Sequence, residues 1–336
     1  MKDTSSVFTH PHLSEAIVYD NRPFPLLITP PSSQPDLRTS PEAVVEYLRN
    51  NRYHVFDLLK NYAVLHFCDF AAQNSTPETF ARIVEDSLGL PNFPYELGNA
   101  VRTAIVGDRV FTANESPPEK PIPFHHELAQ TPNYPAKLLF YCERPADTGG
   151  ETPVLLSRAV YNDLQKEHPD FLQKLEKHGV VYSRVMTPHD RPHSAIGRGW
   201  RGTFRVNSRS EAEDVLSKRG YHFEWIEDGE DSPLKEISPV LPAVIDTEGG
   251  KSFFNQIAAV WGGWRDELNK PEDCVRAGDG SPLDPVSLDA LVSIMNRHRV
   301  AVPWKRGDFM LIDNMQAQHS RGTFTGRRRV LASLAK

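Results

Sequence analysis

The sequence has few cysteines and no long hydrophobic run. Its three cysteines, Cys68, Cys142 and Cys274, lie far apart among 336 residues and form no C-x-x-C pair, which argues against a disulfide framework and against a zinc-finger site. No apolar stretch approaches membrane-spanning length, and the first residues do not resemble the apolar segment of a secretory signal. We therefore expect a cytoplasmic enzyme.

Positive charge is not in excess either. Lysine and arginine number 38 against 44 aspartates and glutamates, a formal net charge of -6, whereas a nucleic-acid-binding chain favours a basic face. The sequence has no internal repeat and no G-x-G-x-x-G after a predicted strand, which argues against a dinucleotide-binding fold. We expect a small-molecule substrate and neither nucleic acid nor a membrane as partner. The pattern leaves the oligomeric state open.

Local patterns predict a few helices among many short strands. Ser40 followed by Pro41 and by apolar residues at 44, 45 and 48 is typical of a capped helix start. Other expected helices cover residues 76–85, 159–164, 171–175 and 285–297. Expected strands cover residues 62–67, 103–106, 109–112, 124–127, 137–142, 180–185, 222–225, 252–255 and 309–312.

This order of elements predicts a mainly β fold with inserted helices, a double-sheet jelly roll. Residues 1–39 are expected to form an irregular lead-in. Residues 187–202, rich in His, Pro, Gly and Arg, are expected to form a long mobile loop that acts as a lid. No boundary is visible, so we expect one catalytic domain over residues 1–336.

The run Phe124-His125-His126-Glu127 is the first candidate for chemistry. Side chains alternate along a strand, so His125 and Glu127 point to one face and His126 to the other. A histidine and a carboxylate on one face form part of a metal site, and two histidines with one carboxylate are the ligand set of non-haem Fe(II) oxygenases. His319 is the best candidate for the third ligand. By itself, H-x-E is a weak signal, because a hydrogen-bonded structural histidine is more common.

Several runs together resemble a known family, the TauD/TfdA superfamily of Fe(II)/2-oxoglutarate dioxygenases, and within it the plant clavaminate-synthase-like proteins. The main runs are Phe124-His125-His126-Glu127, Asp147-Thr148-Gly149-Gly150-Glu151-Thr152-Pro153, Asp313-Asn314 with His319, and Arg328-Arg329-Val330-Leu331. Residues 111–118, 196–200 and 328–334 resemble the plant group in particular. The resemblance extends over nearly the whole chain.

The resemblance implies a double-stranded β-helix of the clavaminate synthase-like type, with Fe(II), 2-oxoglutarate and O2 as cofactor and cosubstrates. It places the iron ligands at His125, Glu127 and His319. It also implies that Thr152 and Arg329 hold the distal carboxylate of 2-oxoglutarate, for which a hydroxyl and a guanidinium are suited. The expected reaction abstracts a substrate hydrogen, releases succinate and CO2, and ends in hydroxylation, desaturation or cyclisation.

Arg329 belongs to a run of three arginines that would otherwise be interpreted as a solvated basic surface. Alternation places Arg329, Leu331 and Ser333 on one face of a strand and Arg328 and Val330 on the other. One arginine can therefore face inward, and from the resemblance we expect it to be Arg329.

Two departures from the family pattern bear on the substrate. Taurine dioxygenase has a second arginine four residues after its cosubstrate arginine to bind the sulfonate, and Ser333 occupies that position here. The acidic ligand is Glu127 rather than aspartate, as in clavaminate synthase and related amino-acid oxygenases. We therefore expect an amino acid or amino-acid-derived substrate. Candidate substrate contacts are Asn114, Asn255 and Arg201, although each is also explained as a structural hydrogen-bonding residue.

Two other functions are compatible with the ligand pattern. A cupin-like hydrolase or isomerase could use another divalent metal without 2-oxoglutarate, but Thr152 and Arg329 would then have no reason for their spacing. A non-catalytic binding protein on a degenerate scaffold is the other alternative, and the complete ligand set argues against it.

Overall fold

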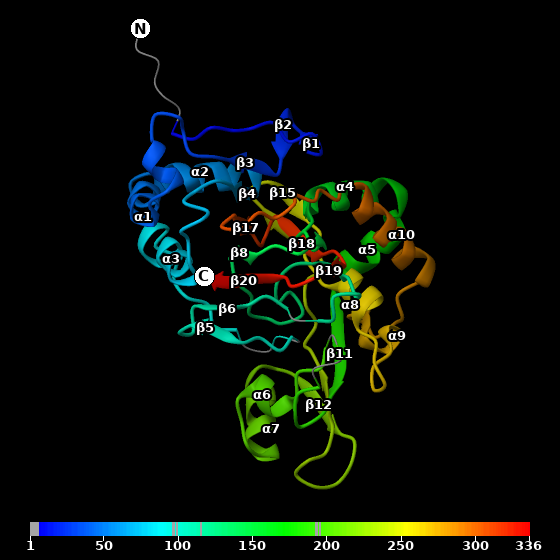
Figure 1. The fold of residues 1–336 in the computed structure, drawn as a ribbon. Helices are drawn as coiled ribbons and strands as arrows, with labels where there is room; N and C mark the ends of the chain where they lie inside the picture. The colour runs from blue at the N-terminus through cyan, green and yellow to red at the C-terminus, as the bar shows by residue number, and fades with distance from the viewer. Residues whose placement is uncertain (1–6, 96–97, 99, 115, 192–193, 195) are drawn as a thin grey trace.

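A seven-stranded sheet forms the centre of the molecule in the computed structural model, which describes residues 7–95, 98, 100–114, 116–191, 194 and 196–336 (Figure 1). Every neighbouring pair of its strands is antiparallel except the first. In order, the strands are β3 (Leu26–Ile28), β4 (Val64–Phe67), β17 (Phe309–Asp313), β8 (Lys137–Arg144), β20 (Arg329–Ala335), β6 (Val110–Thr112) and β5 (Ala104–Val106).

A three-stranded sheet packs on one face of this central sheet. It consists of β10 (Val154–Leu156), β18 (Ala317–Arg321) and β7 (Ile122–His125), all antiparallel. The apolar cluster between the two sheets contains Phe140, Val154 and Ala332. The small sheet positions the candidate site, because His125 on β7 is paired directly with His319 on β18.

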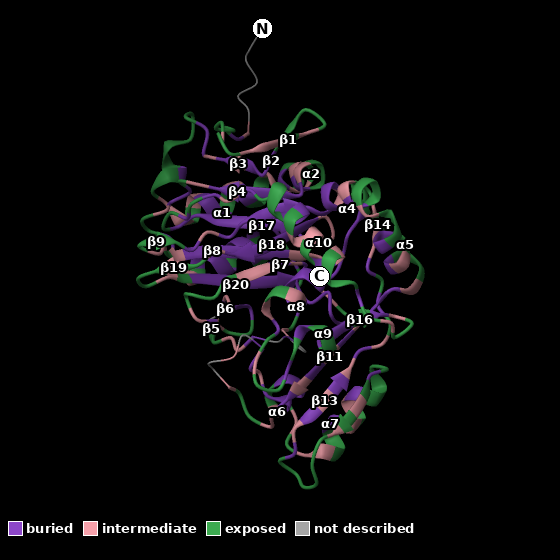
Figure 2. Cartoon of the chain, turned by 90° about the vertical axis from the view of Figure 1, so that its right-hand side faces the viewer, coloured by how far each residue is buried: buried purple, intermediate pink, exposed green. Residues whose placement is uncertain are grey.

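Helices cover the other face of the central sheet. Alternation along β8 sends Leu138 and Phe140 to the three-stranded sheet, and Leu139 and Tyr141 to the helices. Both faces of the central strands are therefore buried, as Figure 2 shows. The covering segments are η1 (Pro35–Arg38), α1 (Pro41–Asn50), α2 (Arg52–Tyr62), α3 (Pro77–Arg82) and the π-helical turn η2 (Ile83–Ser87).

A second group of helices packs beside the three-stranded sheet, and a smaller unit projects below it (Figure 1). The helices are α4 (Ser157–Glu167), α5 (Pro169–His178), α8 (Ile257–Gly263), α9 (Pro271–Cys274) and α10 (Pro285–Arg297). A four-stranded sheet joins the two parts: β12 (His222–Trp225), β13 (Leu234–Ile237), β11 (Val180–Met186) and β16 (Val275–Ala277). The projecting unit adds α6 (Trp200–Phe204) and α7 (Arg209–Lys218), with an apolar cluster of its own.

Three two-stranded ribbons complete the fold: β1 (Ile17–Tyr19) with β2 (Arg22–Phe24), β14 (Ile245–Thr247) with β15 (Gly250–Ser252), and β9 (Thr148–Gly149) with β19 (Phe324–Thr325). The fold is mainly β with inserted helices. All three cysteines are free. In the described part of the chain, no helix combines the length and the apolar character needed to cross a bilayer.

Two local expectations were wrong. Residues 252–255 do not form a strand, because β15 ends at Ser252 and α8 begins at Ile257. The described part of the lead-in is not irregular, because β3 is an edge strand of the central sheet and Phe8 is buried. The three residues of β3 are all apolar, so they show no alternation in the sequence. Residues 1–6 of the lead-in lie outside the described residues.

Candidate metal centre

His125, Glu127 and His319 converge on one point beside the three-stranded sheet. Their ligand atoms all lie within 4.8 Å of one another. The Oε2 atom of Glu127 is 3.5 Å from Nε2 of His319 and 4.0 Å from Nε2 of His125. The structure therefore brings together the three residues expected from the sequence, although 192 positions separate Glu127 from His319.

Glu127 reaches this point from a turn rather than from a strand. β7 ends at His125, and the two residues that follow are held by a side chain instead of a neighbouring strand. The side-chain oxygen of Asn314 accepts a hydrogen bond from the Glu127 backbone N–H (2.8 Å), and its amide nitrogen donates to the Glu127 carbonyl (3.1 Å). Asn314 is fully buried. Its amide replaces a strand partner and keeps His125 and Glu127 on one side.

The protonation states suit a cation. Nδ1 of His125 lies 2.9 Å from the carbonyl oxygen of Pro123, which can only accept, so Nδ1 carries the hydrogen and Nε2 presents its lone pair to the cluster. Burial and the neighbouring His319 lower the pKa of His125 to about 3. Burial alone would raise the pKa of Glu127, but Arg102 and the histidines lower it to about 2. A neutral imidazole and an ionised carboxylate are the metal-binding forms.

Arg102 is a site residue that no pattern in the sequence singles out. Its Nη2 atom donates to Oε1 of Glu127 at 2.8 Å, while Oε2 faces the histidines. The guanidinium lies over the rings of Tyr95 (4.1 Å) and Phe111 (4.9 Å). Its Nε and Nη1 atoms are buried and have no hydrogen-bond partner among the described residues. No motif surrounds Arg102 in the sequence, so only the fold shows its role.

His126 points to the opposite side, as alternation predicts. Its Nδ1 atom lies 2.5 Å from the carbonyl oxygen of Asn314, and Nε2 lies 2.8 Å from the hydroxyl of Ser157. Burial outweighs these hydrogen bonds and lowers the pKa of His126 to about 3. His126 is therefore a structural residue that holds the turn carrying Glu127.

The lowered pKa of His126 predicts a loss of stability in acid. The unfolded chain binds a proton near a pKa of about 6.5, but folded His126 does not until about 3. Below pH ~6.5 the unfolded state therefore binds more protons, and the free energy of unfolding falls by up to about 1.4 kcal/mol per pH unit for this group. Urea unfolding of the metal-free protein at several pH values measures the slope. A His126→Gln variant should show a shallower slope, and equal slopes would contradict the assignment.

The cavity beside His125, Glu127 and His319, whose side chains we call the metal cluster, also contains Thr152 and Arg328. Both residues line it together with His125, Glu127 and His319. Thr152 is buried, and its hydroxyl oxygen accepts from Nε1 of Trp304 at 3.1 Å and from Nη2 of Arg328 at 3.5 Å. Arg328 also donates from Nε to the carbonyl of Gly150 at 2.7 Å.

The expectation that Arg329 faces inward was wrong. Its side chain is 47% exposed and pairs with Glu143 at 2.9 Å, whereas Arg328 faces the metal cavity. Alternation correctly placed Arg328 and Arg329 on opposite faces of the strand, but it did not show which face points to the metal cavity. Leu331 on the Arg329 side and Val330 on the Arg328 side are both buried, because helices cover the outside of the sheet. Apolar residues on both faces give no sequence signal of which face is inner.

Of the three candidate substrate contacts, only Asn114 lies at the site. It lines both of the cavities that border His125 and Glu127, and its side-chain oxygen accepts from the Ser116 N–H at 2.8 Å. Asn255 does not reach the site: it is buried and bonded to the backbone of Ala243 and Ile257. Polar atoms in an apolar segment indicated burial with hydrogen bonds, not substrate contact.

Arg201 also lies away from the metal cluster. Its guanidinium stacks on Trp200 at 4.5 Å and donates to Asp231 at 3.1 Å within the projecting unit. It is not among the described residues that line the cavities around His125.

The expected lid is only partly described, because residues 192, 193 and 195 lie outside the described residues. The described part before α6 has no regular secondary structure, and Ile196 lines the cavity beside His125 and Glu127. Arg191 and Ser194 both bond Asp266, at 2.6 and 2.8 Å. Ile196 therefore brings the loop to the edge of the site, and the action of the loop as a mobile lid stays a prediction.

The chain matches the family model described as taurine catabolism dioxygenase TauD, TfdA family, over residues 20–334. The chain belongs to this TauD/TfdA family. As a TauD/TfdA dioxygenase, the protein is a non-haem iron oxygenase that uses 2-oxoglutarate and O2, and not a hydrolase, an isomerase or a non-catalytic scaffold. The cluster fits iron, because it supplies two imidazole nitrogens and one carboxylate oxygen that lie within 4.8 Å of one another.

Individual relatives agree with the TauD/TfdA assignment. The clavaminate synthase-like protein At3g21360 of Arabidopsis thaliana is 41% identical over 321 residues, which cover 95% of each chain. The dapdiamide synthesis protein DdaC of Enterobacter agglomerans is 25% identical over 240 residues, 67% of this chain and 68% of DdaC. The solved structure of AAD-2 in complex with Mn(II) and N-oxalylglycine has the same fold, with a TM-score of 0.52 at 15% identity, covering 98% of this chain and 97% of AAD-2.

Proposed function

We propose that His125, Glu127 and His319 hold Fe(II), that Arg328 and Thr152 hold 2-oxoglutarate, and that the substrate is an amino acid or an amino-acid-derived molecule. The observation that carries this proposal is that the ligand cluster shares one cavity with Arg328 and Thr152. A dicarboxylate cosubstrate that binds the metal with one end needs a charged donor and a hydroxyl of this kind for its other end.

Arg328 and Thr152 are suited to the distal carboxylate of 2-oxoglutarate. Burial, with Arg321 nearby, lowers the pKa of Arg328 to about 10, so the guanidinium stays charged at neutral pH. Because Trp304 and Arg328 both donate to the Thr152 oxygen, the hydroxyl hydrogen is available for a carboxylate. A charged donor and a hydroxyl together fix both the position and the orientation of the cosubstrate.

The substrate binds in the neighbouring cavity, the one that His125, Glu127 and Ile196 line. The described residues that line this cavity are largely aromatic or aliphatic, including Tyr95, Ile122 and Trp264, and Arg102 is their one cation. The two unpartnered nitrogens of Arg102 are therefore available for a substrate carboxylate. A buried guanidinium beside an apolar wall matches an amino acid, which has one carboxylate and a carbon side chain.

The residues of this chain position the reactants and exclude water. Iron with 2-oxoglutarate and O2 supplies the oxidising chemistry, which abstracts a substrate hydrogen and releases succinate and CO2. The three protein ligands would leave coordination positions open for the cosubstrate and O2. Arg102 holds Glu127 by its second oxygen, which fixes the orientation of this ligand.

The departures from taurine dioxygenase also favour an amino-acid substrate. With Arg328 as the cosubstrate arginine, the position four residues later is Ala332, and Ser333 follows it. Neither can bind a sulfonate as arginine does. The glutamate at position 127 is shared with clavaminate synthase and related amino-acid oxygenases.

We infer that the seven-stranded and three-stranded sheets are the two layers of a double-stranded β-helix, with the metal centre between them. The apolar cluster shared by the two sheets and the pairing of His125 with His319 support this. The projecting unit with α6 and α7 is joined through the four-stranded sheet, which supports a single catalytic domain.

An anaerobic titration tests the oxygenase site. Fe(II) and then 2-oxoglutarate are added to the protein, and the weak visible charge-transfer band of the chelated complex is recorded. A band establishes that both bind at one site. Bound iron without a band would remove 2-oxoglutarate from Arg328 and Thr152 and contradict the proposal.

Arg102→Gln tests the substrate class. The variant is expected to raise KM by about 10- to 100-fold for amino acids that stimulate succinate release, because a charged hydrogen bond to the carboxylate is lost. The carboxamides of the same amino acids are the matched control, since they lack the negative charge. Their KM should change little, after correction for iron content. Equal effects on acids and amides would place the carboxylate elsewhere.

A further inference from the structure

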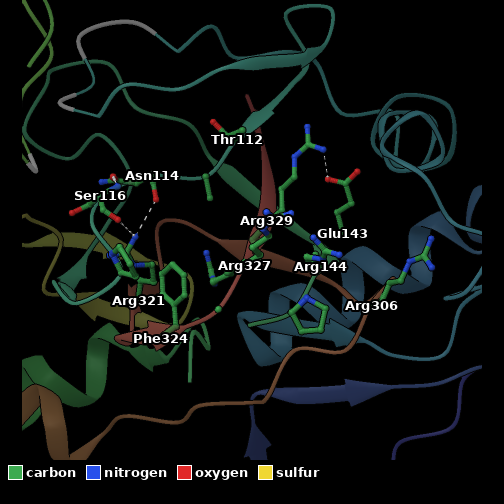
Figure 3. Close-up of a pocket in the computed structure, with 16 residues that line it drawn as sticks. Thr112, Asn114, Ser116, Glu143, Arg144, Arg306, Arg321, Phe324, Arg327 and Arg329 are labelled. Atoms are coloured by element: carbon green, nitrogen blue, oxygen red, sulfur yellow. Dashed lines mark hydrogen bonds and ion pairs between the residues drawn. The ribbon is translucent and has the colours of Figure 1, made fainter. Parts of the chain in front are cut away.

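A third and larger cavity, of about 850 Å³, opens beside the cavity that Thr152 and Arg328 line. Figure 3 shows Arg321 with Asn114 and Ser116 at one end and Arg144, Arg306 and Arg329 toward the other, with Arg327 between them. The cavity contacts β6, β8 and β20 and the loop that follows β19. It is therefore a feature of the main sheet and not of the projecting unit.

The described lining residues of this cavity include six arginines and one carboxylate, Glu143. Glu143 is already paired with Arg329 at 2.9 Å. Four of the arginines are exposed at the rim: Arg144, Arg306, Arg327 and Arg329. The protein as a whole carries a net charge of -6, so this concentration of positive charge is local. A cavity of one sign of charge attracts ions of the other sign from solution.

The deep end of the arginine cavity is also a wall of the metal cavity. Ala113, Asn114, Arg321 and Arg328 line both. Arg321 is committed to structure, because it donates to the carbonyl oxygens of Ser116, Pro117 and Lys120 at 2.7, 2.8 and 2.5 Å. Arg328 is the cation at which the two cavities meet.

We propose that the arginine cavity is the entrance through which dianionic 2-oxoglutarate reaches the site, with Arg144, Arg306 and Arg327 steering it to Arg328. This proposal rests on the proposed function. The substrate side has a different character, since Arg102 is the one cation among its described lining residues and is bonded to Glu127. Charge therefore separates two routes, one for the dianion and one for the substrate.

The proposal predicts an effect on the rate of association rather than on the bound complex. Rim arginines are exposed, and their attraction acts over roughly one Debye length, about 8 Å at physiological salt. Steering of this kind raises association rate constants by about 10- to 1000-fold. It leaves dissociation nearly unchanged, because the bound carboxylate contacts Arg328 and Thr152 instead.

Stopped-flow binding of 2-oxoglutarate to the Fe(II)-loaded protein without O2 measures both rate constants. Tryptophan fluorescence is the signal, since Trp304 contacts Thr152. Arg306→Glu and Arg327→Glu are each expected to lower the association rate constant about 3- to 10-fold at low salt, and less at high salt. Arg306→Lys should retain the wild-type rate constant. Arg299→Glu is the control, because it changes the charge by the same amount at an exposed position outside the lining of the arginine cavity.

Association rate constants that are equal in all variants, or independent of salt, would overturn the proposed entrance. The proposed entrance would also be overturned if Arg306→Lys lowered the association rate constant as much as Arg306→Glu, because the shape of the side chain and not its charge would then matter. Failure of the proposed function gives a different result, namely no binding of 2-oxoglutarate to the wild-type protein at equilibrium.

Discussion

Replacing His319 by alanine is expected to remove iron from the protein and to abolish succinate formation. Loss of a residue that only supports a ligand lowers metal affinity by about 10- to 100-fold, so loss of a ligand should lower it further. The variant is expected to lose iron while the fold persists, because His319 makes no hydrogen bond through Nδ1 within the described structure. Metal analysis after anaerobic loading and desalting gives the iron content, and succinate is measured in parallel.

His126→Gln is the matched control for His319→Ala. His126 adjoins a ligand in sequence but faces Asn314 and Ser157. Its replacement should lower the melting temperature, and its folded fraction should keep more iron than His319→Ala does. If His319→Ala retained iron and succinate production, or if folded His126→Gln lost iron as completely as His319→Ala, the ligand assignment would be incorrect.

The second large effect is expected from the neighbouring arginines. Arg328→Ala should raise the dissociation constant of 2-oxoglutarate by about 10- to 100-fold, because a buried charged hydrogen bond to its carboxylate is lost. Arg329→Ala should change it by less than about 5-fold, since an exposed ion pair contributes about 0–1 kcal/mol. Anaerobic titration of the charge-transfer band gives both constants.

The comparison of adjacent residues tests which of the two faces the metal cavity. A large effect at Arg329 and a small one at Arg328 would mean that Arg329 faces inward, as expected from the resemblance. Because both variants remove one positive charge from the same strand start, general electrostatic effects cancel in the comparison.

The proposed metal ligands could be selected from the sequence, and the structure brings them together, because this chemistry requires a short, recognisable pattern. The spacing of His125 and Glu127 gave the correct side for both, even though β7 ends at His125. The same alternation did not distinguish Arg328 from Arg329, because apolar residues on β20 are buried on both faces. Periodicity reports which residues share a face, and the covering helices decide which face is inner.

Residues that act through long-range contacts could not be found from the sequence. Arg102 lies 25 positions before Glu127, and its role depends on β5, β6 and the turn after β7 coming together. Asn255 was a candidate because it is polar among apolar residues, but such a residue can be satisfied equally well by backbone groups. Strands of the central sheet were expected at β4, β5, β6, β8 and β17, whereas β3 was missed, because its three residues are all apolar and show no alternation.

Asn314 ties together the two ends of a long excursion of the chain. Its side chain holds Glu127 and Pro135, its carbonyl oxygen accepts from His126, and His319 follows five positions later. Almost all of the second helical group, the four-stranded sheet and the projecting unit lie between these points. The two halves of the metal site are thus fastened to each other directly, and Ser157 and Gln256 from the intervening segment add hydrogen bonds to His126. The rest of that segment can differ in sequence, and with it the substrate that the enzyme accepts, while the proposed iron ligands keep their geometry.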